Sequence, residues 1–466
     1  MKIIILGSGA SAAQVISTLI GEAPAGVEFD LQVFDVNHGH ESPYKLRYNL
    51  TKQPSDTSSI EIPLDLPIDV ANKREIWGSF ARGGWTNVWG ATLFEPEIRL
   101  KDSGYGELPS ALAGFYINDS KHRKRAQFLD SQSRTSQRRE FMKIAQSPLA
   151  IRSISADPIQ GCNQCGRCLQ GCEYGHIWSA RAYFESISSL ANVKLEEGFA
   201  ESIRFHRDNV EVILRVDNQL QSYVADMVFC AIGAIQTASL LLRSEIVRTP
   251  IAVSDSQMIV MPFLMSHLKK TGSYENRIAL SEGVVTGDIE VDQHHGDFFI
   301  QLYGYSTSLD QIFCTQFLGL RLLPRFFRKA ILSRIGIAMI FLSQEFSGKI
   351  ILSSENKKVV QSQSPNRINQ RSVISKVLQQ VKPYGLRLLP AFRRVAPIGG
   401  GFHFGKIEAE DLRLCHRSGT IKDFNRFSIV DSSSLQRIDS LPITIKVMRN
   451  CEEIVKFFLR SWSSNR

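Results

Sequence analysis

The sequence predicts an α/β fold that begins with a dinucleotide-binding unit, and three observations near the N-terminus support this. Residues 2–6 form a short apolar run that ends at a glycine, which is typical of a buried parallel strand. An apolar pattern of helical period follows from Ala12 to Ile20, and a second apolar run covers Leu31 to Phe34. A strand, a turn, a helix and a strand in this order predict a Rossmann-like unit.

A glycine loop and an acidic residue supply the chemistry that such a unit needs. Gly7 allows the tight turn, Gly9 lets the backbone approach a pyrophosphate, and the small Ala12 lets the helix pack on the strand. Ser11 lies in the same loop and is counted with the cofactor-binding residues. Asp35 ends the second strand, where a carboxylate binds ribose hydroxyls. An acidic residue favours FAD or NAD over NADP.

Length and charge limit the class of protein. At roughly 150 residues per domain, 466 residues predict two to three domains. The composition is 43% hydrophobic and 22% charged, which excludes a disordered or fibrous chain. The net charge of +9 suits a negative cofactor or an anionic membrane surface, and no nucleic-acid partner is expected because basic residues do not form stripes.

The order of predicted strands and helices changes in the later part of the sequence. Strands are predicted near 193–196, 210–216 and 227–231, and a helix follows the last of them. From about 256 to 390 the alternation of strand and helix is lost, and strands are mixed with apolar helices. Regular α/β signals resume after 395. We therefore expect an inserted α+β domain built on a mixed sheet.

Three further segments resemble the flavin-binding segments of the glucose-methanol-choline (GMC) oxidoreductases, in the same order along the chain. They are the glycine-rich residues 81–91, the strand-to-helix turn at 225–237, and the turn at 429–433, which is followed by 442–445. The resemblance selects FAD over NAD. It implies FAD-binding roles for Gly83, Gly84, Asn87, Gly90, Gly233, Asp431, Pro442 and Thr444.

The physical properties of these residues agree with the resemblance. Glycines admit the backbone to a flat ring, and Asp431 can accept hydrogen bonds from ribityl or pyrophosphate-side donors. A helix that begins near Pro442 directs its positive end toward the flavin.

The resemblance also implies a catalytic histidine. His403 lies in the glycine stretch 399–405, where the family has a base that acts on an alcohol. An imidazole suits that role, although a histidine beside phenylalanines can also be a core residue. The family's second His or Asn precedes the proline of the last helix, but here that position is Leu441. Asn450 is two turns further on and a poor substitute, so the second residue stays unassigned.

Four cysteines form a compact run with the spacing C-x2-C-x2-C-x3-C: Cys162, Cys165, Cys168 and Cys172. This spacing is typical of iron–sulfur clusters, here a [4Fe-4S] or [3Fe-4S] cluster. Gly175 agrees with the cysteine-rich insert of some GMC dehydrogenases, but Glu173 replaces the proline of ferredoxins. Zinc and uncoordinated cysteines are the alternatives.

The other cysteines are predicted to be small buried apolar residues: Cys230, Cys314, Cys415 and Cys451.

One basic and apolar segment, 317–346, has two interpretations. Its longest apolar run, 335–342, is too short to cross a bilayer. The segment either packs in the core beside a basic surface turn or lies on a membrane surface. The N-terminus lacks the pattern of a signal peptide, so a cytoplasmic protein is expected, with or without peripheral membrane contact.

These motifs divide the chain into five expected parts. Residues 1–100 begin the FAD-binding domain, 101–149 are a polar connecting or lid segment, and 150–255 hold the cysteines and the second FAD-binding part. The substrate domain is expected at 256–394. Residues 395–466 complete the FAD-binding domain and carry the active-site histidine.

The expected function is FAD-dependent oxidation of the CH–OH group of an alcohol, sugar or polyol. A hydride passes to the flavin, and an external acceptor such as a quinone, a cytochrome or a ferredoxin-like protein takes the electrons, with or without the iron–sulfur cluster. The alternative is a GMC-like protein that binds FAD but transfers electrons or has altered chemistry, including action on a lipid-linked substrate at a membrane surface.

Overall fold

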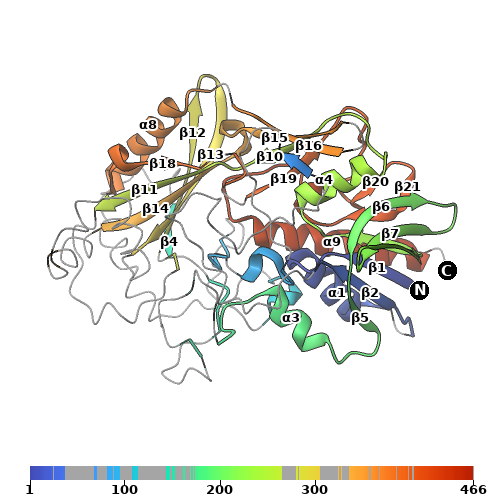
Figure 1. The fold of residues 1–466 in the computed structure, drawn as a ribbon. Coiled ribbons are helices and arrows are strands. Elements are labelled where there is room, and N and C mark those ends of the chain that lie inside the picture. The colour runs from blue at the N-terminus through green and yellow to red at the C-terminus, as the bar shows by residue number, and fades with distance from the viewer. Residues whose placement is uncertain are drawn as a thin grey trace.

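The computed structural model (Figure 1) describes residues 1–24, 26–36, 68–70, 81–87, 89–94, 108–113, 143–146, 149–152, 161–162, 168, 172, 174–264, 280–281, 283–304, 324, 327, 335–355, 358–366, 368–384, 386–396, 398–400 and 403–464. Among the predicted site residues, Cys165 lies outside these ranges. Cys314 lies outside them as well.

A mainly parallel sheet of six strands contains the N-terminal strand (Figure 1). Its order is β20-β21-β9-β1-β2-β5, and β1 pairs in parallel with both β2 and β9. The helix α1 follows β1 and leads to β2, as the apolar pattern predicts, but it extends over Ala10–Glu22. The strands are β1 Lys2–Leu6, β2 Asp30–Asp35, β5 Val193–Glu197, β9 Met227–Cys230, β20 Thr420–Ile421 and β21 Phe424–Ile429.

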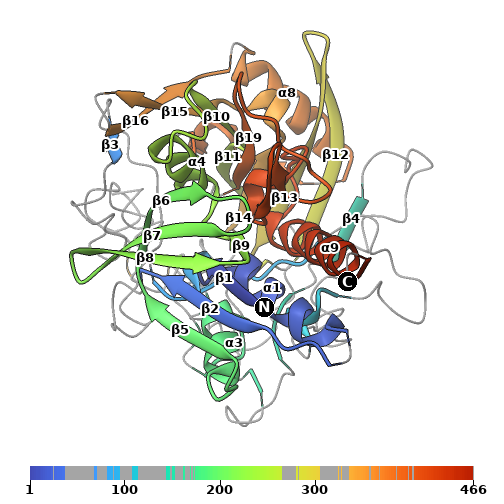
Figure 2. The same ribbon diagram turned by 90° about the vertical axis from the view of Figure 1, so that its right-hand side faces the viewer.

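Both faces of this sheet are covered, which explains why β1 is apolar at consecutive positions. Ile3 and Ile5 belong to the core that includes α1 and α9, whereas Ile4 and Leu6 belong to the core that includes α4 and the three-stranded sheet β6-β7-β8. Figure 2 shows α9 on one side of β1 and β9, with α4 and the three-stranded sheet on the other. These elements are α3 Ala180–Ile187, α4 Ala234–Arg243, α9 Ile443–Ser464, β6 Phe199–Phe205, β7 Val210–Val216 and β8 Gln219–Ala225.

A seven-stranded antiparallel sheet forms the other side of the molecule (Figure 1). Its order is β17-β11-β14-β13-β12-β4, with β18 also paired to β11. The helix α8 covers one face through Val373, Ile374, Val377 and Val381. The elements are β4 Lys143–Gln146, β11 Met258–Leu264, β12 Gly283–Val291, β13 His294–Tyr303, β14 Ile335–Leu342, β17 Arg387–Leu388, β18 Arg394–Val395 and α8 Gln370–Val381.

A five-stranded sheet in the order β19-β10-β15-β16-β3 completes the fold. Its strands are β3 Ile68–Val70, β10 Ile251–Asp255, β15 Lys349–Glu355, β16 Lys358–Ser364 and β19 Phe404–Glu408. Short 3-10 helices are η3 Gly84–Asn87, η4 Ser110–Leu112, η6 Gln344–Phe346, η7 Lys382–Tyr384, η8 Pro390–Phe392 and η9 Ser432–Ser434.

The apolar run at 335–342 is strand β14, which lies between β11 and β13. This part of the segment 317–346 therefore packs in the core. Within the described ranges, no helix has the length and apolar character needed to span a membrane.

Candidate active site

The first glycine turn lies where β1 ends and α1 begins. Gly7 has φ +96°, and a Cβ there would lie 2.5 Å from the carbonyl oxygen of Ala231, so only glycine fits. Gly9 is the N-cap of α1 and forms no side-chain cap. A Cβ on Gly9 would meet no atom within 4 Å. The N-terminus of α1 therefore presents backbone amides beside open space, as an anion site requires.

The glycine-rich segment lies against this turn. The amide of Gly83 donates to Oγ of Ser8 at 3.1 Å, and a Cβ on Gly84 would lie 3.9 Å from Cα of Gly9. Asn87 donates to the carbonyl of Arg82 and so fixes the shape of the segment. The structure thus brings two of the predicted cofactor motifs together.

Asp35 lies at the end of β2 as predicted, but its carboxylate already has a protein partner. Nε of Arg82 donates to Asp35 at 3.1 Å and Nη2 donates at 3.4 Å. Asp35 is 7% exposed and Arg82 25% exposed. The role of Arg82 could not be predicted from the sequence, because only the fold brings Arg82 to a strand end that is distant in sequence.

A second pair of predicted segments meets at Asp431. Its Oδ2 accepts hydrogen bonds from the amide of Gly233 at 2.8 Å and from Oγ1 of Thr237 at 2.6 Å, and its Oδ1 accepts from the amide of Ser433. Burial raises the pKa of Asp431, and these hydrogen bonds offset part of that rise. The observed partners are protein groups that hold two turns together.

Gly233 is also the N-cap of α4, with φ +86° and no atom within 4 Å of a built Cβ. Gly9 and Gly233 therefore both leave open space at a helix N-terminus, and both follow strands of the same parallel sheet.

The N-terminal and C-terminal helices pack together. Sγ of Cys451 in α9 contacts the carbonyl of Ser11 in α1, and Ala12 is fully buried beside α9. Pro442 is buried and directly precedes α9, and Thr444 lies in its first turn. The helix begins one residue after the predicted proline.

His403 directly precedes β19, beside the Asp431 turn. A Cβ on Gly405 would lie 2.4 Å from the carbonyl oxygen of Ser432, which shows how closely β19 and that turn approach. The carbonyl of His403 accepts from the amide of Ser256, and its ring stacks on Phe341 with 4.4 Å between centroids.

The ring of His403 is in a setting that keeps it neutral. Its Nδ1 is buried without a hydrogen-bond partner among the described groups. Burial lowers the pKa of His403 to about 4, so the imidazole is uncharged at neutral pH.

Leu441 shares an apolar cluster with the residue that stacks on His403. We call this the Phe341 cluster: Met258, Val284, Phe299 and Phe341, with Phe94, Val260, Met339, Ala396 and Leu441 packed against it. The position at which the resemblance implied a second polar residue is therefore apolar in space as well as in sequence. Asn450 lies in α9 and donates to Oγ of Ser434 in the turn that follows Asp431.

Gly90 connects the glycine-rich segment to the seven-stranded sheet. A Cβ on Gly90 would lie 3.1 Å from the hydroxyl of Tyr303, and that hydroxyl donates to Oε1 of Gln301.

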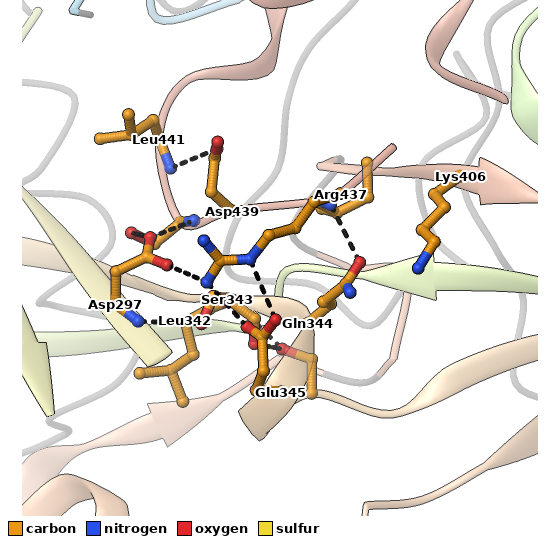
Figure 3. A network of polar contacts seen from close by, with 12 residues as sticks. Asp297, Leu342, Ser343, Gln344, Glu345, Lys406, Arg437, Asp439 and Leu441 are labelled. Atoms are coloured by element: carbon orange, nitrogen blue, oxygen red, sulfur yellow. Dashed lines mark hydrogen bonds and ion pairs between the residues drawn. The ribbon is translucent and has the colours of Figure 1, made fainter. Parts of the chain in front are cut away.

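A polar network fixes the chain before α9 (Figure 3). Arg437 pairs with Asp297 of β13 at 2.6 Å and with Glu345 at 3.0 Å. Ser440 donates its amide and its hydroxyl to Asp297 at 2.8 and 2.5 Å. The hydrogen bonds and charges of these carboxylates raise the pKa of Arg437. The network holds the chain next to Leu441 against the seven-stranded sheet.

Asp255 is a buried carboxyl group that no motif of the sequence indicates. It ends β10 opposite Phe404 and is fully buried, and neither Oδ atom has a hydrogen-bond partner of good geometry among the described groups. Burial raises the pKa of Asp255 to about 7, although the nearby amides of Gly399 and Ser256 act in the opposite direction.

The cysteine run adjoins the core that contains α1. Cys168 is buried there, and Cys162 and Cys172 pack against it partly buried. In the part of the chain that the structure describes, no three His, Cys, Asp or Glu side chains are grouped as metal ligands. The predicted fourth ligand, Cys165, lies outside the described residues.

Two of the remaining cysteines, Cys230 and Cys451, are buried as predicted. The prediction is wrong for Cys415, which is exposed because it precedes the turn that leads to β20.

The fold is similar to that of a known oxidoreductase. The crystal structure of pyridoxine 4-oxidase from Mesorbium loti matches with a TM-score of 0.60 and 10% sequence identity, covering 98% of this chain and 99% of that chain. No family model matches the sequence, and none of the curated proteins matches it. At this identity the likeness shows the fold, a mixed α/β fold with several sheets.

Proposed function

We propose that this protein binds FAD between the turns at Gly9, Gly84 and Gly233 and oxidises the CH–OH group of an alcohol, with His403 as the base. One observation carries the proposal. Gly9 and Gly233 follow the adjacent parallel strands β1 and β9 and leave the space before two helix N-termini open, and Gly84 lies against Gly9. Such an arrangement fits a pyrophosphate and a ribityl chain.

The similar fold of pyridoxine 4-oxidase, by its name an oxidase, supports an oxidoreductase. In the proposed arrangement, residues 1–100, 150–255 and 395–466 form the FAD-binding part, and residues 256–394 form the substrate-binding part.

FAD, when bound, accepts the hydride that leaves the alcohol carbon. The chain's own contribution is to hold the proton. His403 is neutral at pH 7 and has a ring nitrogen without a partner among the described residues, so it can take the hydroxyl proton as the carbonyl forms. The apolar side chains of the Phe341 cluster lie beside that ring.

The experiment is anaerobic mixing of the flavin-loaded protein with a panel of alcohols and sugars. The proposal predicts bleaching of the flavin absorption by at least one of them. A protein that binds FAD but is bleached by none would instead be an electron-transfer or altered flavoprotein, a reading that the apolar side chain at Leu441 favours.

The acceptor of the electrons is an external molecule in this proposal. An iron–sulfur cluster at the four cysteines is a separate proposal that rests on their spacing.

A further inference from the structure

The face of the seven-stranded sheet that lies opposite α8 carries an ordered set of side chains. Alternate residues of a strand share a face, so Asp297, Phe299, Gln301 and Tyr303 of β13 lie on one side. Their neighbours Phe298 and Ile300 pack in the core beneath α8. The first side therefore has the polar Asp297 at one end of the strand and the apolar Phe299 next to it. The hydrogen-bonded pair Gln301 and Tyr303, beside Gly90, lies at the other end.

The apolar middle of this face is the Phe341 cluster, and it adjoins the proposed base. Phe299 and Phe341 are opposite each other in the ladder, and Phe341 stacks on the ring of His403. Phe94 reaches the cluster from the FAD-binding side, with 5.4 Å between its ring centroid and that of Phe299.

Several members of the cluster keep exposed apolar surface. Phe94, Val260, Met339 and Leu441 are only partly buried, although each packs against buried members of the cluster. Apolar surface beside a proposed base favours an apolar ligand, since covering it removes carbon surface from water.

Leu441 is held in place rather than free to move away. Its amide donates to Oδ1 of Asp439, and the preceding Ser440 donates twice to Asp297 (Figure 3). The charged side chains of this network thus form ion pairs with one another and hydrogen bonds with the backbone of the loop. The side chain of Leu441 is the group that packs in the Phe341 cluster.

We infer that the substrate is an alcohol with an apolar carbon framework, an alkyl or aryl alcohol, and that Leu441 helps to select it; this inference rests on the proposed function. The hydroxyl group lies at His403, and the carbon framework lies on the partly exposed side chains of Phe94, Met339 and Leu441. A sugar or polyol would leave its additional hydroxyl groups without partners against this surface, which lowers its kcat/KM.

The test compares apolar alcohols with polyols on the flavin-loaded protein under anaerobic conditions. The expected kcat/KM for flavin bleaching rises by about fourfold for each methylene from 1-butanol to 1-hexanol. Benzyl alcohol and 1-hexanol exceed sorbitol and glucose by at least about a hundredfold. A polyol with a higher kcat/KM than 1-hexanol would overturn the inference.

Binding provides a readout that does not depend on turnover. With the flavin reduced beforehand, calorimetry should detect 1-hexanol with a negative heat-capacity change and no binding of sorbitol. Tighter binding of sorbitol contradicts the inference even if no alcohol bleaches the flavin. Protein that never holds flavin refutes the proposed function, whereas loaded protein that prefers sorbitol refutes only the substrate class.

The variant L441N tests the selecting residue. It should lower kcat/KM for 1-hexanol by about tenfold and raise the ratio of sorbitol to 1-hexanol. The control L220N makes the same exchange at an exposed position of β8 and should leave that ratio unchanged. A ratio in L441N within about twofold of the wild-type value would show that Leu441 does not select the substrate.

Discussion

The carboxylate of Asp431 accepts a hydrogen bond of 2.8 Å from the backbone amide of Gly233, a residue that lies 198 positions earlier in the chain. The two residues follow β21 and β9, which are parallel neighbours in the six-stranded sheet. A single buried side chain therefore fixes the C-terminal turn to the N-terminus of α4. In the proposed function, this contact sets the width of the space that a dinucleotide enters.

Replacing Asp431 with asparagine tests this contact. The amide group of asparagine would place a donor against the amide of Gly233 or Ser433, so we expect the free energy of unfolding to fall by about 2–3 kcal/mol. Flavin content should fall as well. Asp411→Asn is the matched control, because Asp411 also accepts from a backbone amide and a threonine hydroxyl but is exposed. Equal losses in the two variants, measured by urea unfolding, would contradict the assigned role of Asp431.

Two glycines of one turn should separate folding from cofactor binding. Gly7→Ala places a methyl group against the carbonyl of Ala231 at positive φ, so the variant should lose at least about 2 kcal/mol of stability. Gly9 has open space around it and an ordinary φ of −78°, so Gly9→Ala should lower the free energy of unfolding by only about 1 kcal/mol.

The same Gly9→Ala variant should bind FAD about tenfold or more weakly, because its methyl group enters the space assigned to the pyrophosphate. Thermal unfolding and fluorescence titration with FAD measure the two effects. Unchanged FAD affinity in Gly9→Ala would place the cofactor elsewhere.

Asp255 makes stability depend on pH. Its pKa is about 7 in the folded protein against 3.8 for the free group, so the folded state holds the proton between these values. The contribution of Asp255 to the free energy of unfolding is therefore full below pH 3.8 and is lost as the pH rises through 7, by about 4 kcal/mol. Asp255→Asn removes this loss, so the variant should gain stability relative to wild type between pH 4 and pH 8. A difference between the two proteins that does not change with pH would contradict the buried carboxyl group.

His403→Gln should retain flavin but lose bleaching by the best alcohol by about a hundredfold or more, since a glutamine cannot take the hydroxyl proton. Stopped-flow absorbance of the loaded, anaerobic protein measures the rate, and the flavin spectrum shows that the site is intact. A rate equal to that of the wild type would remove His403 as the base.

Metal analysis decides among the three interpretations of the cysteine run. Iron and acid-labile sulfide should co-purify under anaerobic conditions and be lost in Cys168→Ser, while Cys415→Ser, at an exposed cysteine outside the run, should keep them. Zinc in their place, or no metal, would refute the cluster.

The sequence predicts the elements whose signals are local. The apolar run of β1, the helical period of α1 and the glycines of the first turn are each set within a few residues, and the structure has all three. Boundaries differ by one or two residues, because capping depends on neighbours that the period does not include.

Long-range partners are not visible in a single sequence. Nothing near Arg82 indicates Asp35 as its partner, and nothing near Thr237 indicates Asp431. The eight-residue run of β14 is ambiguous for a different reason: a short apolar run fits a buried strand or a membrane-surface segment equally well until its neighbours are known.

The absorption spectrum of protein purified under anaerobic conditions and supplied with FAD tests the proposed function most directly. We predict the two absorption bands of a bound oxidised flavin, retained after gel filtration and weakened in Gly9→Ala. A spectrum without bound flavin, from wild-type protein that is folded by circular dichroism, would contradict the assignment of the space between the turns at Gly9, Gly84 and Gly233 to this cofactor.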